Sequence, residues 1–372
     1  EARGRAAALR TGEVALGRRL AQELCATVGD EISLRVLQPG ALPREAPLAA
    51  RTDETTVRLR ARIVAVLDDE DLGRFDLAAV QTAPRNAFVA RSWLQERLDQ
   101  AGRANLLLVG GDGGERAGEK LRDALRSVWR AKDSGLRVER PSRSVLQIVS
   151  DRVFLDGPVA EGALALADGV GALSYLVNEI ANADDPQRAT PYSFVNALAP
   201  SPLGAFGVSP TPSDLADDEI VLNEWTAERL RLAPGGRVRL SYSVVQANQR
   251  FEARERWFRV RAVLPMSAME TERMLMPSFP GLTDVDSCAQ WDVGLPMDEA
   301  RLKDPDNEAY WNAYRDTPKA IVTLAAGQEM WGSRFGSLTA VRVPAARDSA
   351  MELERELTER LIAAGAAPDP VP

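Results

Sequence analysis

The alternation of polar and apolar residues predicts several short strands. Glu31–Val36 and Arg237–Tyr242 alternate residue by residue, which is typical of a half-buried strand. Leu59–Val64 and Phe258–Val263 alternate arginine with apolar residues, so one face of each strand is expected to be solvated. Other segments place apolar residues at helical spacing among charges, and these are 115–129 and 348–363. Short strands mixed with helices in this way favour an α+β fold.

An internal repeat organises these elements. Glu13–Leu24 resembles Glu219–Leu230 without a gap, at a separation of 206 positions (13 to 219). Three more segment pairs follow in the same order, and they are Leu59–Val64 with Phe258–Val263, Asn86–Val89 with Lys319–Val322, and Arg103–Val109 with Arg334–Val341. We therefore predict two tandem-duplicated lobes, each a mixed sheet with helices on one face. Chance similarity between generic strand–helix units is the alternative interpretation.

The repeat divides the chain into three parts. Residues 1–141 form the predicted first lobe, residues 142–214 a middle β-rich segment with a linker, and residues 215–372 the second lobe. The second lobe carries a long polar excursion at 266–317, the kind of insertion that is usually functional or mobile. Within the middle segment, we predict strands at 144–149, 152–155 and 174–180, and a linker at 200–212. Charged helices are expected at both ends, over 3–13 and 351–363.

Composition excludes several kinds of chemistry. The chain has 372 residues and no histidine, which removes Ser-His-Asp and Cys-His catalysis and any metal site built on imidazole. Two cysteines, Cys25 and Cys288, are too few for a cysteine-rich metal cage. They either pair in an oxidising compartment or remain as two buried free thiols, and the second interpretation is preferred.

Charge and hydropathy limit the partners. The net charge is −8, which disfavours binding to nucleic acid and to anionic lipid. The most apolar stretch, Gly162–Val177, is too short to span a membrane and contains Asp168. No signal peptide is visible at the start of the sequence. These features fit a cytosolic protein and equally a soluble loop of a membrane protein.

Two motifs suggest ligand binding. Gly110–Gly114 follows a predicted strand and precedes a helix, as a phosphate loop does, but it lacks the Gly-Lys-Ser/Thr ending, so we predict a flexible turn. Acidic residues gather at Asp68–Asp71, Asp284–Asp286 and Asp304–Glu308. Solvated loop charge is the default interpretation, and a Ca²⁺-type site within 284–308 is the sharper hypothesis. We predict no catalytic residue, no cofactor and no metal.

Tryptophan positions suggest a core and a contact surface. Trp225, Trp257 and Trp331 lie at apolar positions of predicted elements, so we expect them in the core. Candidate partner contacts are Trp291, Tyr310 and Trp311, because they lie in the long excursion and exposed aromatic residues anchor interfaces.

Several segments resemble one family of membrane proteins. Glu219–Tyr242 is similar to the strand–helix–turn–strand segment of the extracytoplasmic core of FtsX/MacB-type ABC-transporter permeases. The first copy keeps the family's Gly-Asp turn as Val28-Gly29-Asp30, whereas the second has Pro234-Gly235-Gly236 and loses the acidic position. Further segments resemble the large-ectodomain permeases of this superfamily, namely 71–76, 86–89, 103–108, 150–155, 280–285, 310–311, 315–320 and 331–336.

The resemblance implies a function without catalysis. The chain would lie on the extracytoplasmic (periplasmic) side of a bacterial cell membrane, between membrane helices that flank it. Its expected partners are a cytoplasmic ATP-binding subunit and a second permease chain, and it would couple ATP-driven helix motion to export or to a substrate outside the membrane. Two alternatives are a periplasmic module that binds a ligand between two lobes and a hydrolase that uses paired carboxylates.

Overall fold

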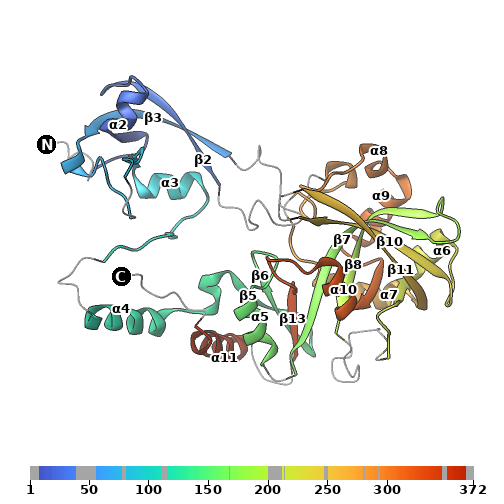
Figure 1. The fold of residues 1–372 in the computed structure, drawn as a ribbon. Coiled ribbons are helices and arrows are strands. Elements are labelled where there is room, and N and C mark those ends of the chain that lie inside the picture. The colour runs from blue at the N-terminus through green and yellow to red at the C-terminus, as the bar shows by residue number, and fades with distance from the viewer. Residues whose placement is uncertain are drawn as a thin grey trace. The chain divides into compact units, whose positions relative to one another are not determined.

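The structure, a computed structural model, consists of two compact units. It describes residues 8–38, 56–77, 81–109, 115–166, 168–199, 212, 214–246, 250–279, 281–291, 294–345 and 350–365. The first unit comprises Glu1–Gly40 and Thr52–Gly110, and the second comprises Ala41–Arg51 and Gly111–Pro372. They are drawn in blue to cyan and in green to red, respectively (Figure 1).

The first unit is a four-stranded mixed sheet with the order β2-β3-β1-β4. Its elements are β1 (Glu13–Gly17), α2 (Arg18–Glu23), β2 (Glu31–Leu37), β3 (Thr56–Leu67), η1 (Asp69–Asp71), β4 (Ala87–Val89) and α3 (Arg91–Arg97). Alternate residues of β3 point into a small core, where Leu59 and Ile63 are buried with Trp93 of α3. The arginines between them face solvent, so the sequence alternation places the core on one side of this strand.

The second unit contains a nine-stranded sheet with the order β10-β11-β9-β12-β8-β7-β13-β6-β5. Its first half contains α4 (Glu115–Val128), η2 (Ala131–Ser134), β5 (Leu136–Ser142), β6 (Val145–Ser150), α5 (Gly157–Leu164), β7 (Val170–Asn182) and β8 (Ala189–Leu198). Next come β9 (Glu219–Asn223), α6 (Glu224–Leu230), β10 (Arg237–Val245), β11 (Phe251–Leu264), α7 (Met266–Met269), η3 (Glu270–Leu275) and η4 (Cys288–Gln290). The last elements are α8 (Glu299–Leu302), α9 (Pro305–Tyr314), β12 (Ala320–Thr323), α10 (Leu324–Trp331), β13 (Ala340–Pro344) and α11 (Ala350–Ala363).

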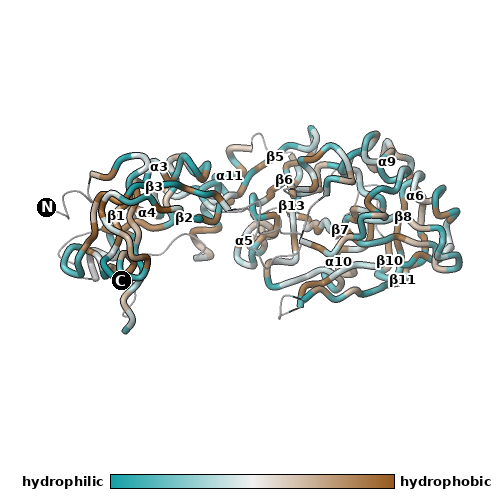
Figure 2. The backbone as a smooth tube through the Cα atoms, turned by 90° about the horizontal axis from the view of Figure 1, so that it is seen from above, coloured by the Kyte–Doolittle hydropathy of each residue, from teal (hydrophilic) through white to brown (hydrophobic). Residues whose placement is uncertain are grey.

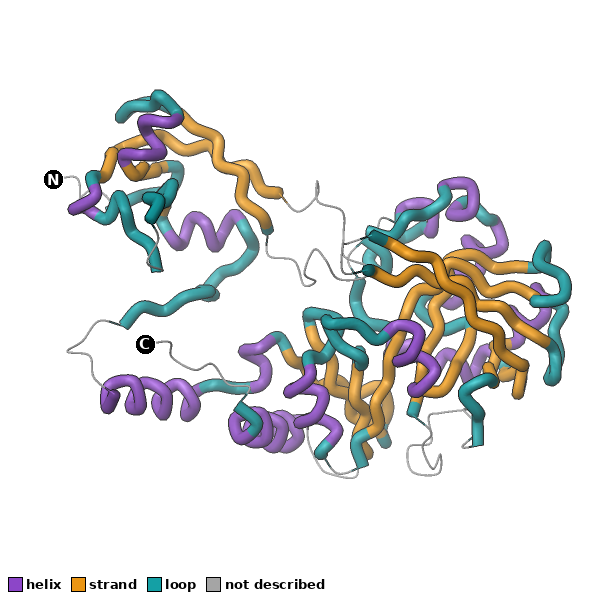
Figure 3. The backbone as a smooth tube through the Cα atoms, in the orientation of Figure 1, coloured by secondary structure: helices purple, strands orange, loops and turns teal. Residues whose placement is uncertain are grey.

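Part of this sheet closes into a barrel. Strand β7 pairs with β8 along most of its length, and its end also pairs with β10, at Val238–Ser241 opposite Glu179–Asn182. The ring β10-β11-β9-β12-β8-β7 is therefore closed, while the start of β7 pairs with β13 and continues the sheet into β6 and β5. The strands are orange in Figure 3. We call this closed ring the barrel.

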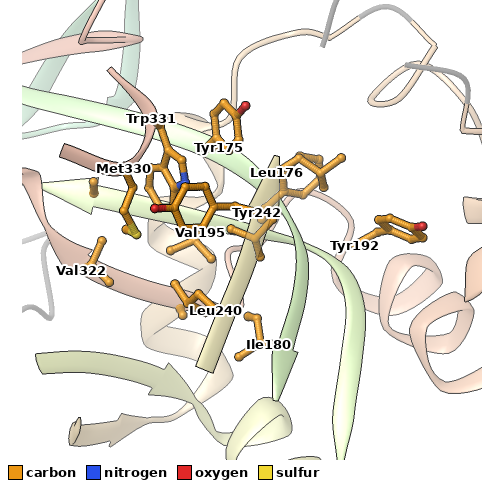
Figure 4. Close-up of a cluster of buried hydrophobic side chains, with 14 of the residues drawn as sticks. Tyr175, Leu176, Ile180, Tyr192, Val195, Leu240, Tyr242, Val322, Met330 and Trp331 are labelled. Carbon is orange, nitrogen blue, oxygen red and sulfur yellow. The ribbon is translucent and has the colours of Figure 1, made fainter. Parts of the chain in front are cut away.

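The main core fills and surrounds the barrel. Tyr175 of β7 stacks on Trp331 of α10, with the ring centroids 5.3 Å apart, and its hydroxyl donates a hydrogen bond to the Ser243 carbonyl at 2.8 Å. Both side chains appear with Val195 and Leu240 in Figure 4. Strands β7 and β8 are buried over nearly their whole length, and the buried residues include the polar Ser174, Ser193 and Asn196. Figure 2 colours the backbone by the hydropathy of each residue.

The two units share one arrangement of strands. In both, a strand pairs in parallel with one neighbour and antiparallel with the other: β1 with β3 and β4, and β9 with β11 and β12. An outer strand, β2 or β10, then pairs antiparallel with β3 or β11. Each parallel pair is also interrupted by a bulge at the corresponding place. The mixed α+β class that the sequence predicts is confirmed by these sheets and their helices.

The predicted alignment of one strand pair is shifted by two residues. Arg62 lies opposite Glu13, and Arg259 lies opposite Glu219, so Arg62 corresponds to Arg259. The sequence alignment of Leu59–Val64 with Phe258–Val263 instead placed Arg60 against Arg259. Side chains in a strand repeat every two residues, so this shift leaves the same residues facing the core and cannot be detected from the polar pattern.

Two predicted strands are not strands in the structure. Residues 103–109 are extended without pairing, and residues 152–155 form a turn and loop after β6. Strand β6 pairs instead with β5 and β13. An isolated apolar run does not specify a strand, because the ladder depends on partners that are distant in the sequence.

The division into parts also differs from the prediction. Strands β6, β7 and β8 of the predicted middle segment belong to the same sheet as the strands of the predicted second lobe. Helix α4, placed by the sequence in the first lobe, belongs to the second unit. The excursion at 266–317 contributes buried residues to the core, among them Phe279, Leu282 and Leu302. The predicted helix at 351–363 is present as α11, whereas residues 11 and 12 of the other predicted end helix form a turn.

Candidate functional site

The three aromatic residues proposed as partner contacts are buried. Trp291, Tyr310 and Trp311 expose 6%, 4% and 2% of their surface. Trp291 and Trp311 meet edge to face with their centroids 5.2 Å apart, and both lie against Phe194 of β8. The structure corrects the expectation of an exposed contact surface here, because the excursion packs its aromatic residues onto the barrel.

A buried lysine lies where the excursion meets the barrel. Lys319, which directly precedes β12, is 2% exposed. Its amine donates hydrogen bonds to the Thr190 hydroxyl at 2.7 Å and to the Asn307 side-chain carbonyl. It also lies 4.7 Å from the ring centroid of Trp225 and 4.8 Å from that of Tyr310, within the range of cation–π attraction. We call these five residues the Lys319 centre.

Three elements surround Lys319 in this centre. Thr190 comes from β8, Trp225 from α6, and Asn307 and Tyr310 from α9. Asn223 connects them: its amide donates to the Tyr310 hydroxyl at 2.9 Å and to the Pro318 carbonyl at 3.1 Å. Nothing in the sequence marks Lys319 as a site, because lysine is ordinarily exposed and no local signal indicates a buried one.

Burial controls the protonation of the centre. It lowers the pKa of Lys319 from 10.5 to about 7, while the nearby Asp304 favours the cation and Arg229 opposes it. Burial also raises the pKa of the Cys288 thiol to about 12, so this cysteine is held as the unreactive thiol. An amine with such a pKa is suited to proton exchange, but the Lys319 side chain is buried away from solvent. The geometry of the centre therefore favours a structural role, in which Lys319 binds α9 to the barrel.

A second buried polar network holds the beginning of the excursion. The Arg342 guanidinium on β13 pairs with the Glu272 carboxylate at 2.7 Å, and both side chains are at most 8% exposed. Arg342 also donates to the Gln147 side-chain carbonyl at 3.0 Å, and the Gln147 amide donates to the Met274 carbonyl at 2.7 Å. A buried pair of this kind is costly to break, because the remaining charge is left without a partner.

The acidic residues of the excursion have other partners. Arg229 pairs with Asp304 at 2.7 Å and also with Asp306, and the Glu308 carboxylate accepts the backbone N–H of Cys288 at 2.9 Å. Among the residues that the structure describes, no three histidine, cysteine or acidic side chains are grouped as metal ligands are. These contacts do not support the hypothesis of a cation site within 284–308.

The remaining predicted residues have mixed outcomes. Trp331 is buried as expected and Trp225 is half-buried, but Trp257 is 57% exposed. Cys25 is exposed and Cys288 is buried, and both are free thiols.

Gly110–Gly114 and nearly all of the predicted linker at 200–212 lie outside the described residues. None of the described helices is both long enough and apolar enough to cross a membrane.

Comparisons with known proteins found distant structural likenesses. No protein-family model and no curated protein matches the chain. The periplasmic region of MacB from Actinobacillus actinomycetemcomitans is similar with a TM-score of 0.33 and 12% identity, over 62% of this chain and 87% of that one. A domain of a protein named as a permease from Porphyromonas gingivalis is similar with a TM-score of 0.31 and 10% identity, over 63% and 84%. These values do not identify the chain.

Proposed function

We propose that the chain is the extracytoplasmic domain of a bacterial ABC-transporter permease of the MacB type. In this proposal, helices that flank the chain cross the membrane, and a cytoplasmic ATP-binding subunit moves them. The domain passes that movement to a substrate or partner outside the membrane and catalyses no reaction itself. A second permease chain completes the transporter.

The observation that carries this proposal is the recurrence of the segment that resembles the family. In both units a strand leads into a helix, a glycine turn and a second strand. The turn contacts the parallel strand in the same way: the Gly29 N–H donates to the Ile63 carbonyl at 2.8 Å, and the Gly235 N–H to the Val260 carbonyl at 2.7 Å. Both glycines have a positive φ, which favours glycine at the turn. We infer that the two units arose by internal duplication.

The chemistry of the interior is consistent with a mechanical role. The most strongly perturbed lysine is sealed in the Lys319 centre, and the Arg342–Glu272 pair is buried beside η3. The Lys319 centre fastens the excursion to the barrel, and the Arg342–Glu272 pair fastens η3 of the excursion to β13, so the second unit is suited to move as a stiff body. A stiff body transmits the displacement of attached helices without absorbing it through internal rearrangement.

The first experiment examines the gene and the location of its product. We expect about 20 consecutive apolar residues directly before residue 1 and further such stretches after residue 372. The full-length protein, produced in bacteria, should sediment with membranes and be cleaved within these residues by protease added to spheroplasts. A soluble full-length product that begins and ends at these residues would exclude the proposal, and a signal peptide without membrane spans would favour a binding module.

The second experiment tests coupling. Single cysteines introduced on the exposed surface of the full-length protein report its conformation through labelling rates. With the ATP-binding subunit present, we expect these rates to differ between the ATP-bound and nucleotide-free states. The control is a subunit whose phosphate-loop lysine is replaced. Rates that do not respond to nucleotide in the intact transporter would contradict coupling through this domain.

A further inference from the structure

In the part of the first unit that the structure describes, the strands that complete the second unit have no counterpart. In the second unit the outer edge of β10 pairs with β7, and the outer edge of β12 pairs with β8, so a β7–β8 hairpin closes the barrel. The corresponding strands of the first unit, β2 and β4, are the two edges of an open sheet. Their outer backbone groups therefore have no strand partner in the described part of the first unit.

Side chains on these edges are correspondingly exposed. Ile32 and Leu34 of β2 are only half-buried, whereas their counterparts Val238 and Leu240, 206 positions later, are fully buried against the hairpin. The same difference separates Val89 of β4 from Val322 of β12. The sequence is equally apolar at both sets of positions, so the missing cover accounts for the difference.

A third segment of the first unit is also uncovered. Leu106, Leu107, Leu108 and Val109 follow α3 and expose 49%, 70%, 61% and 60% of their surface. After the equivalent helix α10, the second unit has β13, whose residues 340–343 are at most 7% exposed. Strand β13 is held there between β6 and the start of β7. Four consecutive exposed apolar residues are unusual on a soluble surface and indicate an interaction site.

We propose that β2, β4 and residues 106–109 of the first unit, which we call the open side, bind a two-stranded antiparallel β-hairpin of another polypeptide. This hairpin takes the place that β7–β8 occupies in the second unit. One hairpin suffices for all three uncovered segments, because β7 alone pairs with both β10 and β13, and β8 pairs with β12. Such pairing is strand addition, in which backbone hydrogen bonds provide affinity and side chains provide specificity.

The positive charge of the open side predicts an acidic residue in the hairpin. Arg35 and Arg58 lie opposite each other on β2 and β3, and the described residues provide no carboxylate for either. Like charges in this position repel. Arg35 corresponds to Ser241, which lies opposite Glu179 of β7 in the second unit. The hairpin is therefore expected to carry an acidic residue where β7 carries Glu179.

A second copy of this chain fits the open side poorly. Its β7–β8 hairpin already lies in its own barrel, and every other described strand of the second unit except β5 has neighbours on both sides. The free edges of a second copy, β5 in its second unit and β2 and β4 in its first, each supply a single strand, which does not cover β2, β4 and the 106–109 segment together. A different polypeptide is the partner that the geometry favours, and this inference is independent of the transporter function proposed above.

Proline substitution tests whether the β2 edge is open. Ser33 corresponds to Arg239, which pairs with Ala181 of β7. The Ala183 N–H donates to the Arg237 carbonyl, so the backbone groups of Arg237 and, two residues later, Arg239 face β7. By this correspondence the Ser33 N–H faces the outer edge, where proline is tolerated if no strand is paired. We expect Ser33→Pro to leave the melting temperature within 1–2 °C of the parent and Arg239→Pro to lower it strongly. Equal destabilisation by the two prolines would show that the edge is already occupied and would overturn the proposal.

Binding is tested with a hairpin taken from this chain. The probe is a synthetic peptide of residues 170–198, added to the whole chain, and amide hydrogen exchange is followed at 31–36, 87–89 and 106–109. We expect exchange at all three segments to slow at least tenfold. Ser33→Ala should keep this protection and Ser33→Pro should lose it at β2. A peptide carrying Glu179→Lys should bind at least tenfold more weakly, because it meets Arg35.

Two results would overturn the inference. The first is exchange that stays unchanged with the peptide at its solubility limit, or that slows equally in Ser33→Pro. The second is protection of 31–36 that grows with the concentration of the chain itself, accompanied by dimers in analytical ultracentrifugation. That second result would identify another copy as the occupant.

Discussion

Lys319 illustrates how one residue combines opposing effects. Two hydrogen-bond acceptors and the faces of two aromatic rings favour its cation, whereas removal from water disfavours it. The net direction is a pKa lowered to about 7, so loss of solvation is the larger effect. Folding therefore favours release of this proton near neutral pH, and stability depends on pH in a defined window.

The pH dependence of stability tests the protonation of Lys319. Between pH 7 and 10.5 the unfolded chain holds the proton and the folded chain does not, so stability should rise with pH by up to about 1.4 kcal/mol per pH unit. Lys319→Met removes this contribution. We expect the difference in unfolding free energy between parent and Lys319→Met to change in favour of the parent from pH 7.5 to 9.5 in urea titrations.

A matched control separates this effect from others. Lys303 is exposed at the end of α8, and Lys303→Met should retain the slope of the parent. Cys288, whose pKa is raised to about 12, contributes a slope of opposite sign in all three proteins, and it cancels in the difference. Equal slopes for parent and Lys319→Met would mean that Lys319 stays charged when the protein is folded.

Gly327 is required by a close approach of α10 to β8. A Cβ at this position would lie 2.2 Å from the Ala197 Cβ and 3.3 Å from the Trp331 ring. We expect Gly327→Ala to cost about 1–3 kcal/mol, measured by urea unfolding. Adding Ala197→Gly should recover part of the loss. Gly118→Ala in α4 has open space around it and should be neutral or stabilising by up to about 1 kcal/mol. Additive losses in the double variant would refute the clash.

At the scale of elements, the helix that follows each first strand begins differently in the two units. Helix α6 starts at Asn223, whose side-chain oxygen accepts the Thr226 N–H at 2.7 Å. Helix α2 starts at Gly17, without a side-chain cap. A side chain at Gly17 would collide with the Gly73 carbonyl, because a Cβ there would lie 2.6 Å from that oxygen. The start of this helix therefore depends on a side-chain cap in the second unit and on a close backbone contact in the first.

The cap of α6 also joins it to the excursion, so its removal should be costly. We expect Asn223→Ala to destabilise the protein by about 2–4 kcal/mol in urea unfolding, since it removes a cap and two buried hydrogen bonds. Asn223→Ser keeps an acceptor for the Thr226 N–H and should lose less. Ser287→Ala, which removes the cap of η4, should cost about 1 kcal/mol or less. A loss for Asn223→Ala no larger than that for Ser287→Ala would contradict this account.

At the scale of the whole molecule, each unit has its own core. The clusters around Ile63 and Trp93 contain only first-unit residues, and the clusters around Val195 and Leu146 contain only second-unit residues. A separate core is what allows a unit to fold alone. Among the described residues, the first unit has a four-stranded open sheet, whereas the second has a nine-stranded sheet that includes the closed barrel. The first unit should therefore be the less stable of the two.

Calorimetry should resolve two unfolding transitions. Ile63→Ala should lower the melting temperature of the first, and Val195→Ala that of the second, because each removes buried methyl groups from one core. Each variant should move the other transition by no more than 1–2 °C. One cooperative transition that both variants shift equally would show that the units do not unfold independently.

The sequence by itself determined the α+β class, the strands with a strict alternation and the repeated order of elements. These features are local: the period of a strand or helix and the glycine at a turn depend on a few neighbouring residues. Strands β5 and β8 escaped prediction, and so did the ends of the units. Strand β8 is buried on both faces and mixes apolar residues with the buried polar residues Thr190, Ser193 and Asn196, so its sequence shows no alternation that would mark a strand.

Only the tertiary structure decided what depends on residues distant in the sequence. Trp291 and Lys319 are both buried because the excursion folds back onto the barrel, although one is an aromatic residue and the other a charge. Similar apolar strands are covered in the second unit and uncovered in the first, since among the described residues only the second unit contains a hairpin that pairs with them. A side chain's environment is set by whatever packs against it, and the residues next to it in the sequence do not contain that information.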